Sequence, residues 1–97
     1  MTVVSVPEVF APLGPLTMQR ASAVLEAGRR IAQAGPAVVD LAAVTSADSA
    51  ALALILDWLR TANQAGHAIE LRNLPAGLAS LAALYDIDGL LPLEAKR

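Results

Sequence analysis

A stretch from Val38 to Gly66 changes its hydrophobic pattern twice, and this change limits the folds open to the chain. It begins with a short apolar run ending at Asp40, passes through a polar turn, and continues as a long apolar-periodic segment. This pattern predicts a strand, a loop and a helix, in that order. Asp48 suits the helix N-cap, because its carboxylate can accept hydrogen bonds from amides of the first turn. Gly66 suits the left-handed position after the last turn.

The residues before this stretch predict two short strands and a first helix. Val3 to Val6 and Val9 to Leu13 are apolar runs, and Pro7-Glu8 between them predicts a turn or bulge. Gly14-Pro15 is expected to break the extended run, and Thr17 suits the N-cap of a helix that stops at Gly35-Pro36. The stripe expected to be buried in this helix consists of Met18, Ala21, Val24, Leu25, Gly28, Ile31 and Ala32.

The remaining segments complete an α/β pattern. Ala37 to Leu41 is apolar at consecutive positions, which is typical of a central strand buried on both faces. Alternation from Ala68 to Leu71 predicts another strand, and Pro75 is expected to open a third helix that runs through Tyr85. Leu90 to Leu93 suits a short edge strand or a packed tail. The order predicts one α/β domain over residues 1–97, with a mixed β-sheet of roughly four to five strands and three to four helices packed against it.

The bulk composition excludes several classes of function. A chain of 97 residues fits one domain, and the absence of cysteine excludes disulfides, thiolate metal ligands and a cysteine nucleophile. The net charge is −2 and the seven basic residues are scattered, which argues against nucleic-acid binding. No apolar run reaches the ~18 residues of a membrane span, and the N-terminus lacks the pattern of a secretory signal. We therefore expect a soluble cytoplasmic protein without direct membrane insertion.

Individual polar residues offer little chemistry. His67 is the sole histidine and is expected in an exposed loop, where no second imidazole can complete a metal site. Asp40 and Asp48 flank the loop before the central helix, but their spacing matches no metal loop, and Asp86 and Asp88 suit a solvated turn. The glycines form neither a dinucleotide-binding nor a phosphate-binding motif. We expect no catalytic residue, no cofactor and no metal.

The surface of the central helix predicts a protein contact instead. At about 100° per residue its apolar residues cover an arc of roughly 200°, whereas a cover helix needs little more than about 100°, so part of the arc is expected outside the core. These residues are Ala51, Leu52, Leu54, Ile55, Leu56, Trp58, Leu59 and Ala62. The neighbours of Leu56 on its edge of the helix are Ser49, Ala53, Asp57 and Arg60.

The third helix carries no charged residue between Leu74 and Tyr85. Its core side is expected to consist of Leu78, Leu81 and Leu84. Its opposite side consists of Ala76, Ala79, Ser80 and Ala83. A solvated face normally carries Lys or Glu, so this uncharged face of small residues indicates a close-packed contact. The alternative is a solvated, high-propensity helix in an Ala-rich protein.

Residues 48–52, which read DSAAL, resemble the D-S-[SA]-G-L signature of STAS domains (sulfate transporter and anti-sigma factor antagonist). The entry to the first helix at residues 14–17, the segment AIELRNLP and the tail YDIDGLLPL resemble MlaB-like members, the small cytoplasmic subunits of the Mla lipid-transport ABC complex. The resemblance implies one STAS domain that binds and supports the transporter ATPase, peripherally at the inner membrane, in a complex that maintains outer-membrane lipid asymmetry. The expected partner-binding residues are Ser46, Asp48, Ser49, Ala53, Leu56, Asp57, Arg60, Ala76, Ala79, Ser80 and Ala83.

Two positions depart from the family motif. In phosphoregulated anti-sigma antagonists the modified serine is the third motif residue, and here that position is Ala50, which has no hydroxyl. Ser49 occupies the position where MlaB-like members keep a Ser or Thr that matters for ATPase binding. Ala51 replaces the common glycine. The alternative function is a free-standing anti-sigma antagonist or scaffold without the phosphoswitch, and a small enzyme using Ser49 or Asp48 lacks a base and metal ligands.

Overall fold

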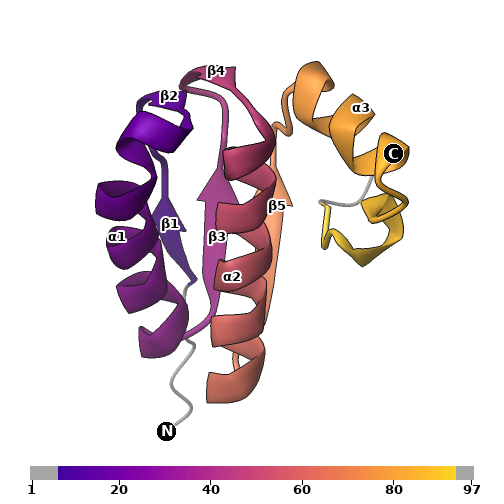
Figure 1. Ribbon diagram of the computed structural model, residues 1–97. Helices are drawn as coiled ribbons and strands as arrows, with labels where there is room; N and C mark the ends of the chain where they lie inside the picture. The colour runs from indigo at the N-terminus through magenta and orange to yellow at the C-terminus, as the bar shows by residue number, and fades with distance from the viewer. Residues whose placement is uncertain (1–6, 94–97) are drawn as a thin grey trace, which may run out of the picture.

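The computed structural model describes residues 7–93, so the strand expected over Val3 to Val6 lies outside the described residues. The α/β fold expected from the sequence is confirmed (Figure 1). In chain order the elements are β1 (Glu8–Phe10), β2 (Gly14–Leu16), the 3₁₀ turn η1 (Met18–Arg20), α1 (Ala21–Ala34), β3 (Ala37–Asp40), β4 (Val44–Ala47), α2 (Ser49–Ala65), β5 (Ile69–Arg72), α3 (Ala76–Leu84) and the 3₁₀ turn η2 (Asp88–Leu90).

The main sheet has the strand order β1-β3-β5, and both neighbouring pairs are parallel. β3 is the central strand, and Ala37, Val38 and Val39 are buried, as the run of apolar residues predicts. β2 and β4 form a separate parallel pair. Leu93 adds an isolated parallel bridge to β5, near where the sequence suggests an edge strand. Within residues 7–93 the strands therefore form two parallel sheets, whereas the sequence pattern predicts one mixed sheet.

The β2–β4 pair occupies two segments that the sequence assigns to turns. Gly14 begins β2 instead of breaking the chain, and the polar stretch before α2 forms β4. The Gly14 amide donates to the Ala43 carbonyl (N···O 3.1 Å), and the Asp48 amide donates to the Leu16 carbonyl (3.4 Å). The fully buried Leu16 side chain accounts for this pairing, because it draws β2 against the core. Turn patterns depend on neighbouring residues, so they do not predict a contact between segments this far apart in the sequence.

The entry to the first helix also differs from the prediction. β1 ends at Phe10, three residues before the expected end, and α1 begins only at Ala21. Thr17 precedes η1, and its side chain makes no capping hydrogen bond. The guanidinium of Arg20 donates to the Leu13 and Pro15 carbonyls (2.7 and 3.3 Å), which holds the loop before η1 against this turn.

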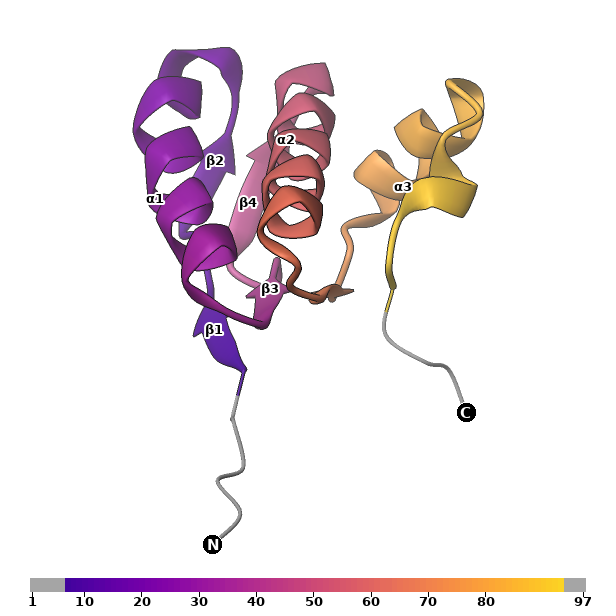
Figure 2. The same cartoon turned by 90° about the horizontal axis from the view of Figure 1, so that it is seen from below.

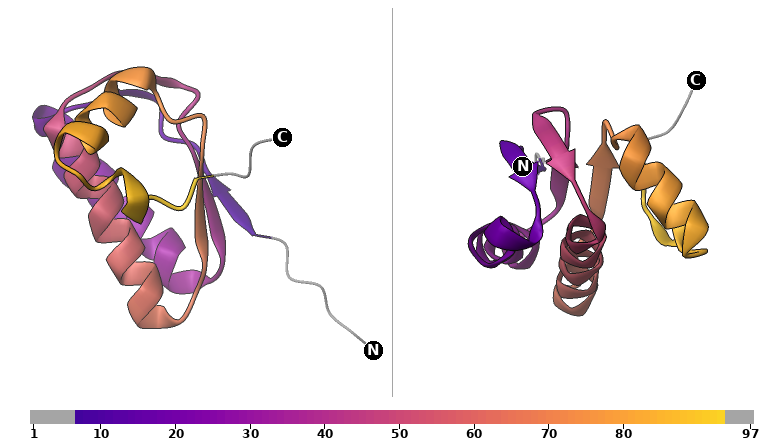
Figure 3. Two further views of the ribbon diagram at one scale, coloured as in Figure 1. Left: turned by 90° about the vertical axis from the view of Figure 1, so that its right-hand side faces the viewer. Right: turned by 45° about the horizontal axis from the view of Figure 1, so that its top comes forward.

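The helices α1 and α2 cover the same face of the main sheet, and α3 lies beside α2 (Figure 2, Figure 3). The central helix α2 thus shares the core cluster with strand residues such as Val39 and Leu71, and it contacts α1 and α3. This position uses the wide apolar arc of α2 inside the molecule. Six of the eight arc residues are buried, whereas Leu56 and Leu59 are half-buried against the core, so only a small part of the arc lies outside it, as expected. No helix within residues 7–93 has the length and hydropathy to cross a membrane.

Gly28 of α1 lies directly against the Trp58 ring of α2. The Trp58 ring is only 1% exposed, and its Nε1 donates to the carbonyl of Leu25 (3.1 Å). Phe10 meets the same ring edge-on, with centroids 5.4 Å apart. A Cβ atom on residue 28 would lie 2.2 Å from Trp58 Cε2, so the backbone of α1 can rest on the ring only where the side chain is a hydrogen.

The C-terminal end of α2 follows the sequence prediction. Gly66 has φ +78°, in the left-handed region that glycine adopts without strain. The His67 amide donates to the Ala62 carbonyl (2.9 Å), and the Gly66 amide donates to the Asn63 carbonyl (3.1 Å), which is a Schellman ending. This ending holds His67 against the helix. His67 lies in the loop between α2 and β5, as predicted, but it is half-buried instead of exposed.

The Gly28–Trp58 contact gives a stability prediction. Gly28→Ala should lower the free energy of unfolding by about 1–3 kcal/mol, because the new methyl group overpacks the ring. Gly77→Ala is the matched control, since Gly77 also lies in a helix but a Cβ atom added to it would have no neighbouring atom within 4 Å. That substitution should raise the free energy of unfolding by up to about 1 kcal/mol through helix propensity. Equal effects in urea titrations of the two variants would contradict the account of Gly28.

Candidate functional site

The first turn of α2 is built by a cap and by the β4 strand before it. The Asp48 carboxylate accepts a hydrogen bond from the Ala50 amide (2.9 Å), so the predicted N-cap is confirmed. The capping residue is half-buried, whereas Ser49 and Ser46 are exposed beside it. Both hydroxyl groups therefore stand at the molecular surface around the positive end of the helix.

The outer flank of α2 continues this surface along the helix. Ala53 and Arg60 are exposed, and Leu56 is half-buried. Helical geometry places Ser49, Ala53, Leu56 and Arg60 within an arc of about 60° that faces away from the core. Leu56 packs partly against the core cluster. The flank thus joins an exposed hydroxyl, a methyl group, part of a leucine and a guanidinium.

The outer face of α3 consists of small uncharged side chains. All four residues expected there are exposed: Ala76, Ala79, Ser80 and Ala83. The core side is formed by Leu78, the half-buried Leu81 and Ala82. Leu84 is 75% exposed, so its predicted place on the core side is wrong. Each step of three residues falls about 60° short of a full turn, and two such steps from Leu78 carry Leu84 away from the core.

The two parts of the predicted surface lie at the same end of the molecule. The first turns of α2 and α3 both stand at the carboxyl end of β3 and β5 (Figure 1). The helices contact one another, and both contribute to a single core cluster. We call their outward faces together the α2–α3 face. It consists of Ser46, Ser49, Ala53, Leu56, Arg60, Ala76, Ala79, Ser80 and Ala83.

Asp57 differs from the other predicted partner-binding residues because its carboxylate is directed at α1. Arg29 makes a two-pronged ion pair with it, from Nε to Oδ2 (2.7 Å) and from Nη2 to Oδ1 (2.9 Å). Arg60 donates to Oδ1 from within α2 (2.9 Å). The Asp57 side chain is only 12% exposed. These contacts give Asp57 a role in joining α1 to α2, and the sequence offers no signal for a pairing between residues so far apart.

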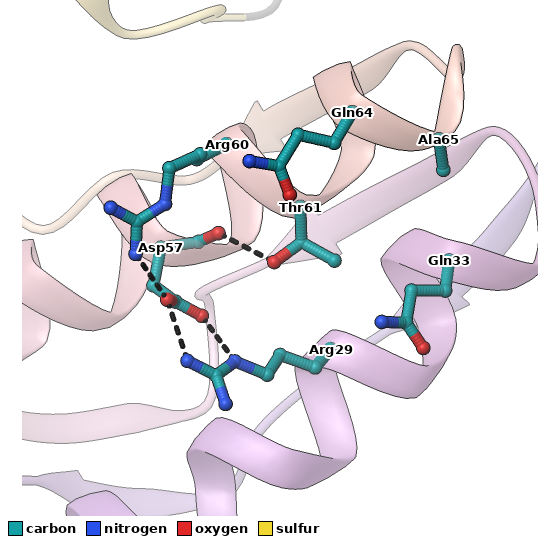
Figure 4. A pocket seen from close by; sticks show the side chains of 7 residues that line it. All are labelled: Arg29, Gln33, Asp57, Arg60, Thr61, Gln64 and Ala65. Atoms are coloured by element: carbon teal, nitrogen blue, oxygen red, sulfur yellow. Dashed lines mark hydrogen bonds and ion pairs between the residues drawn. The ribbon is translucent and has the colours of Figure 1, made fainter.

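A polar cavity of about 420 Å³ adjoins this ion pair between the C-terminal halves of α1 and α2 (Figure 4). Its lining residues are Arg29, Gln33, Asp57, Arg60, Thr61, Gln64 and Ala65. The Thr61 hydroxyl donates to the Asp57 carbonyl (2.9 Å), so it is bonded to the helix backbone. The two guanidinium groups share one carboxylate. This arrangement neutralises part of the positive charge that an anion would need.

The carboxylates near the α2 loop are each held locally. Asp40 accepts from Asn73 Nδ2 (2.8 Å) and from the Ala42 amide (3.0 Å), and the Asn73 contact is the main reason that the pKa of Asp40 is lowered. Asp48 is engaged in the helix cap. Within residues 7–93 no group of three or more His, Asp or Glu residues is placed to hold a metal ion. The α2–α3 face is therefore the arrangement that invites a functional interpretation.

Comparison with known families gives one match. A family model described as "Mlab, STAS domain" matches residues 13–92, which is most of the chain and includes all of α1, α2 and α3. The match spans the DSAAL motif at the start of α2 and the uncharged third helix. No curated protein matches the chain.

The Arg29–Asp57 ion pair predicts a pH-dependent contribution to stability. The Arg29 guanidinium is the main cause that lowers the pKa of Asp57 in the folded state. The stabilisation should therefore be complete above pH ~4, the pKa of an unfolded aspartate, and should be lost as the pH falls through the lower folded value. Urea titrations between about pH 2 and 7 should show this acid-sensitive part of the free energy of unfolding in the wild type. They should not show it in Asp57→Asn. Arg29→Gln should reduce this acid-sensitive part. If both variants keep the pH dependence of the wild type, the ion pair does not cause it.

Proposed function

The chain belongs to the MlaB-type STAS domain family, and from that membership we propose that it is a non-enzymatic subunit that binds and supports the ATPase of a lipid-transport ABC complex. The proposed place of action is the cytoplasmic face of the inner membrane, which the subunit reaches through its partner. The proposed contact is the α2–α3 face. The chain would thus act by binding and positioning another protein, without cofactor or metal.

The observation that carries the proposal is the exposed and uncharged outer face of α3, a helix whose first turn stands at the same end of the fold as the first turn of α2. Lysine and glutamate normally cover a solvated helix face, because they cost little in propensity and increase solubility. Alanine and serine instead permit a partner backbone to approach closely without ordering long side chains. Such a face suits a flat protein contact, which fits a subunit held in an assembly.

The chemistry of the motif favours constitutive binding over a phosphoswitch. Ala50 stands where phosphoregulated relatives carry the modified serine, and it has no hydroxyl to accept a phosphate. Ser49 is exposed at the first residue of α2, where a partner can contact its hydroxyl directly. Purification of the chain from its native host, with mass-spectrometric identification of the bound protein, tests the proposal. The expected companion is an ABC ATPase, and an anti-sigma kinase would support the alternative function.

The first prediction for binding concerns Ser49. Ser49→Arg should leave the melting temperature unchanged, because the side chain is exposed, and it should abolish association with the ATPase. A charge buried at the contact without a counter-charge costs about 2 to 5 kcal/mol or more. Ser22→Arg is the matched control, since Ser22 is also exposed near the start of a helix but lies on α1. If both variants co-purify equally with the ATPase at an unchanged melting temperature, the proposed contact is wrong.

The second prediction concerns α3. Ala79→Glu together with Ala83→Lys places an oppositely charged pair one turn apart on the exposed face, which should stabilise the helix by about 0.2–0.5 kcal/mol. The isolated chain should therefore melt at the same or a slightly higher temperature. Complex formation and complementation of a detergent-sensitivity phenotype should both fall, because the longer side chains clash with the partner. Full complementation would remove α3 from the contact.

A further inference from the structure

A second exposed cluster lies just beyond the α2–α3 face, where α3 ends and η2 begins. Leu84 is 75% exposed, Tyr85 54% and Leu90 66%, so three large apolar side chains within seven residues face solvent. Leu84 follows Ser80 by one helical turn, which places it next to the uncharged outer face of α3. The cluster is therefore continuous with that face and is much more apolar than it.

The backbone around this cluster is firmly held, so the exposure does not arise from a frayed end. Asp86 adopts φ +58°, and its amide donates to the Ala83 carbonyl (3.1 Å). The Ile87 amide donates to the Ala82 carbonyl (2.9 Å), which completes a Schellman ending for α3. Ile87 packs against the core, and Leu91 is only 8% exposed. Apolar residues that alternate with the exposed ones thus anchor the segment from inside.

Among the described residues of this segment, 73–93, the charged side chains have one sign. Between residues 73 and 93 the only charged residues are Asp86 and Asp88, and both are exposed. The basic residues of the described chain lie on other elements: Arg20, Arg29, Arg30, Arg60 and Arg72. A surface that is complementary to this cluster must therefore offer apolar contact area together with positive charge. An anionic lipid surface does not fit, because it attracts basic segments and repels carboxylates.

We propose that this cluster, the C-terminal cap (Leu84, Tyr85, Asp86, Asp88 and Leu90), inserts into an apolar depression rimmed by Lys or Arg on the ATPase. The inference rests on the proposed function and names the chemistry of the partner's surface. Leu84, Tyr85 and Leu90 would supply the buried contact area, because leucine and tyrosine side chains are large and apolar. The carboxylates of Asp86 and Asp88 would attract the positive rim during association with the ATPase. The small-residue face of α3 would then lie against the flatter surface beside the depression.

The apolar part of the cap is tested by substitutions on exposed side chains. Leu84→Ser and Leu90→Ser should each leave the melting temperature nearly unchanged and raise the Kd for the co-purified ATPase by about tenfold or more. Leu13→Ser is the matched control, because Leu13 is 70% exposed but precedes β2 at the other side of the fold. It should leave the Kd unchanged.

The charged part of the cap is tested by the kinetics of association. Asp86→Asn with Asp88→Asn removes both charges, and asparagine tolerates the left-handed backbone of residue 86. The variant should associate more slowly at low salt and lose most of the salt dependence of the wild type, with a smaller change in dissociation rate. Glu8→Gln removes one exposed charge from β1 and should change neither.

The outcomes separate the cap from the proposed function. Normal binding by the cap variants, with loss of binding in Ser49→Arg, would overturn the cap inference and leave the ATPase contact in place. Normal binding by every variant including Ser49→Arg would refute the contact itself. The cap inference would also fail if Leu84→Ser abolished self-association in sedimentation or binding to anionic phospholipid vesicles without affecting the ATPase. In those cases the occupant would be a second copy of the chain or a membrane.

Discussion

The close approach of α1 to the Trp58 ring is the contact on which the arrangement of the helices depends. Gly28 lets the α1 backbone rest on the ring, and the Leu25 carbonyl accepts the indole proton, so a large side chain is buried without an unsatisfied donor. Phe10 closes the ring from the sheet side. One buried aromatic ring of α2 thus contacts both α1 and β1.

The inner and outer sides of α2 differ in how much of the fold they contact. Its inner arc is used for the sheet, for α1 and for α3, and the Arg29–Asp57 ion pair adds a polar link at the α1 border. On the outer flank from Ser49 to Arg60, Leu56 packs partly against the core and Arg60 donates a hydrogen bond to Asp57, whereas Ser49 and Ala53 are exposed. Substitutions of the exposed Ser49 and Ala53 should therefore have little effect on stability, which is the property that the proposed docking surface requires.

Local signals and distant contacts explain what the sequence predicts and what it misses. The cap at Asp48 and the helix end at Gly66 depend on neighbouring residues, and both are confirmed. The β2–β4 pairing depends on contacts across the whole of α1, and no local pattern indicates it. Helix periodicity accounts for the exposure of the four small residues predicted on the outer face of α3. The exposure of Leu84 does not follow from three-residue spacing, because each such step falls about 60° short of a full turn.

Parallel pairing of the strands has a consequence for how the chain reaches this structure. Val9 pairs with Val38, and Val38 pairs with Glu70, so each contact in the main sheet closes a loop that contains a complete helix. Such loops carry an entropy cost before any strand contact forms. The hydrogen bonds of a helix join residues within about one turn, so we expect α1 and α2 to form early and to pack together at Trp58. The sheet would then be assembled on their apolar sides, and its completion would limit the folding rate.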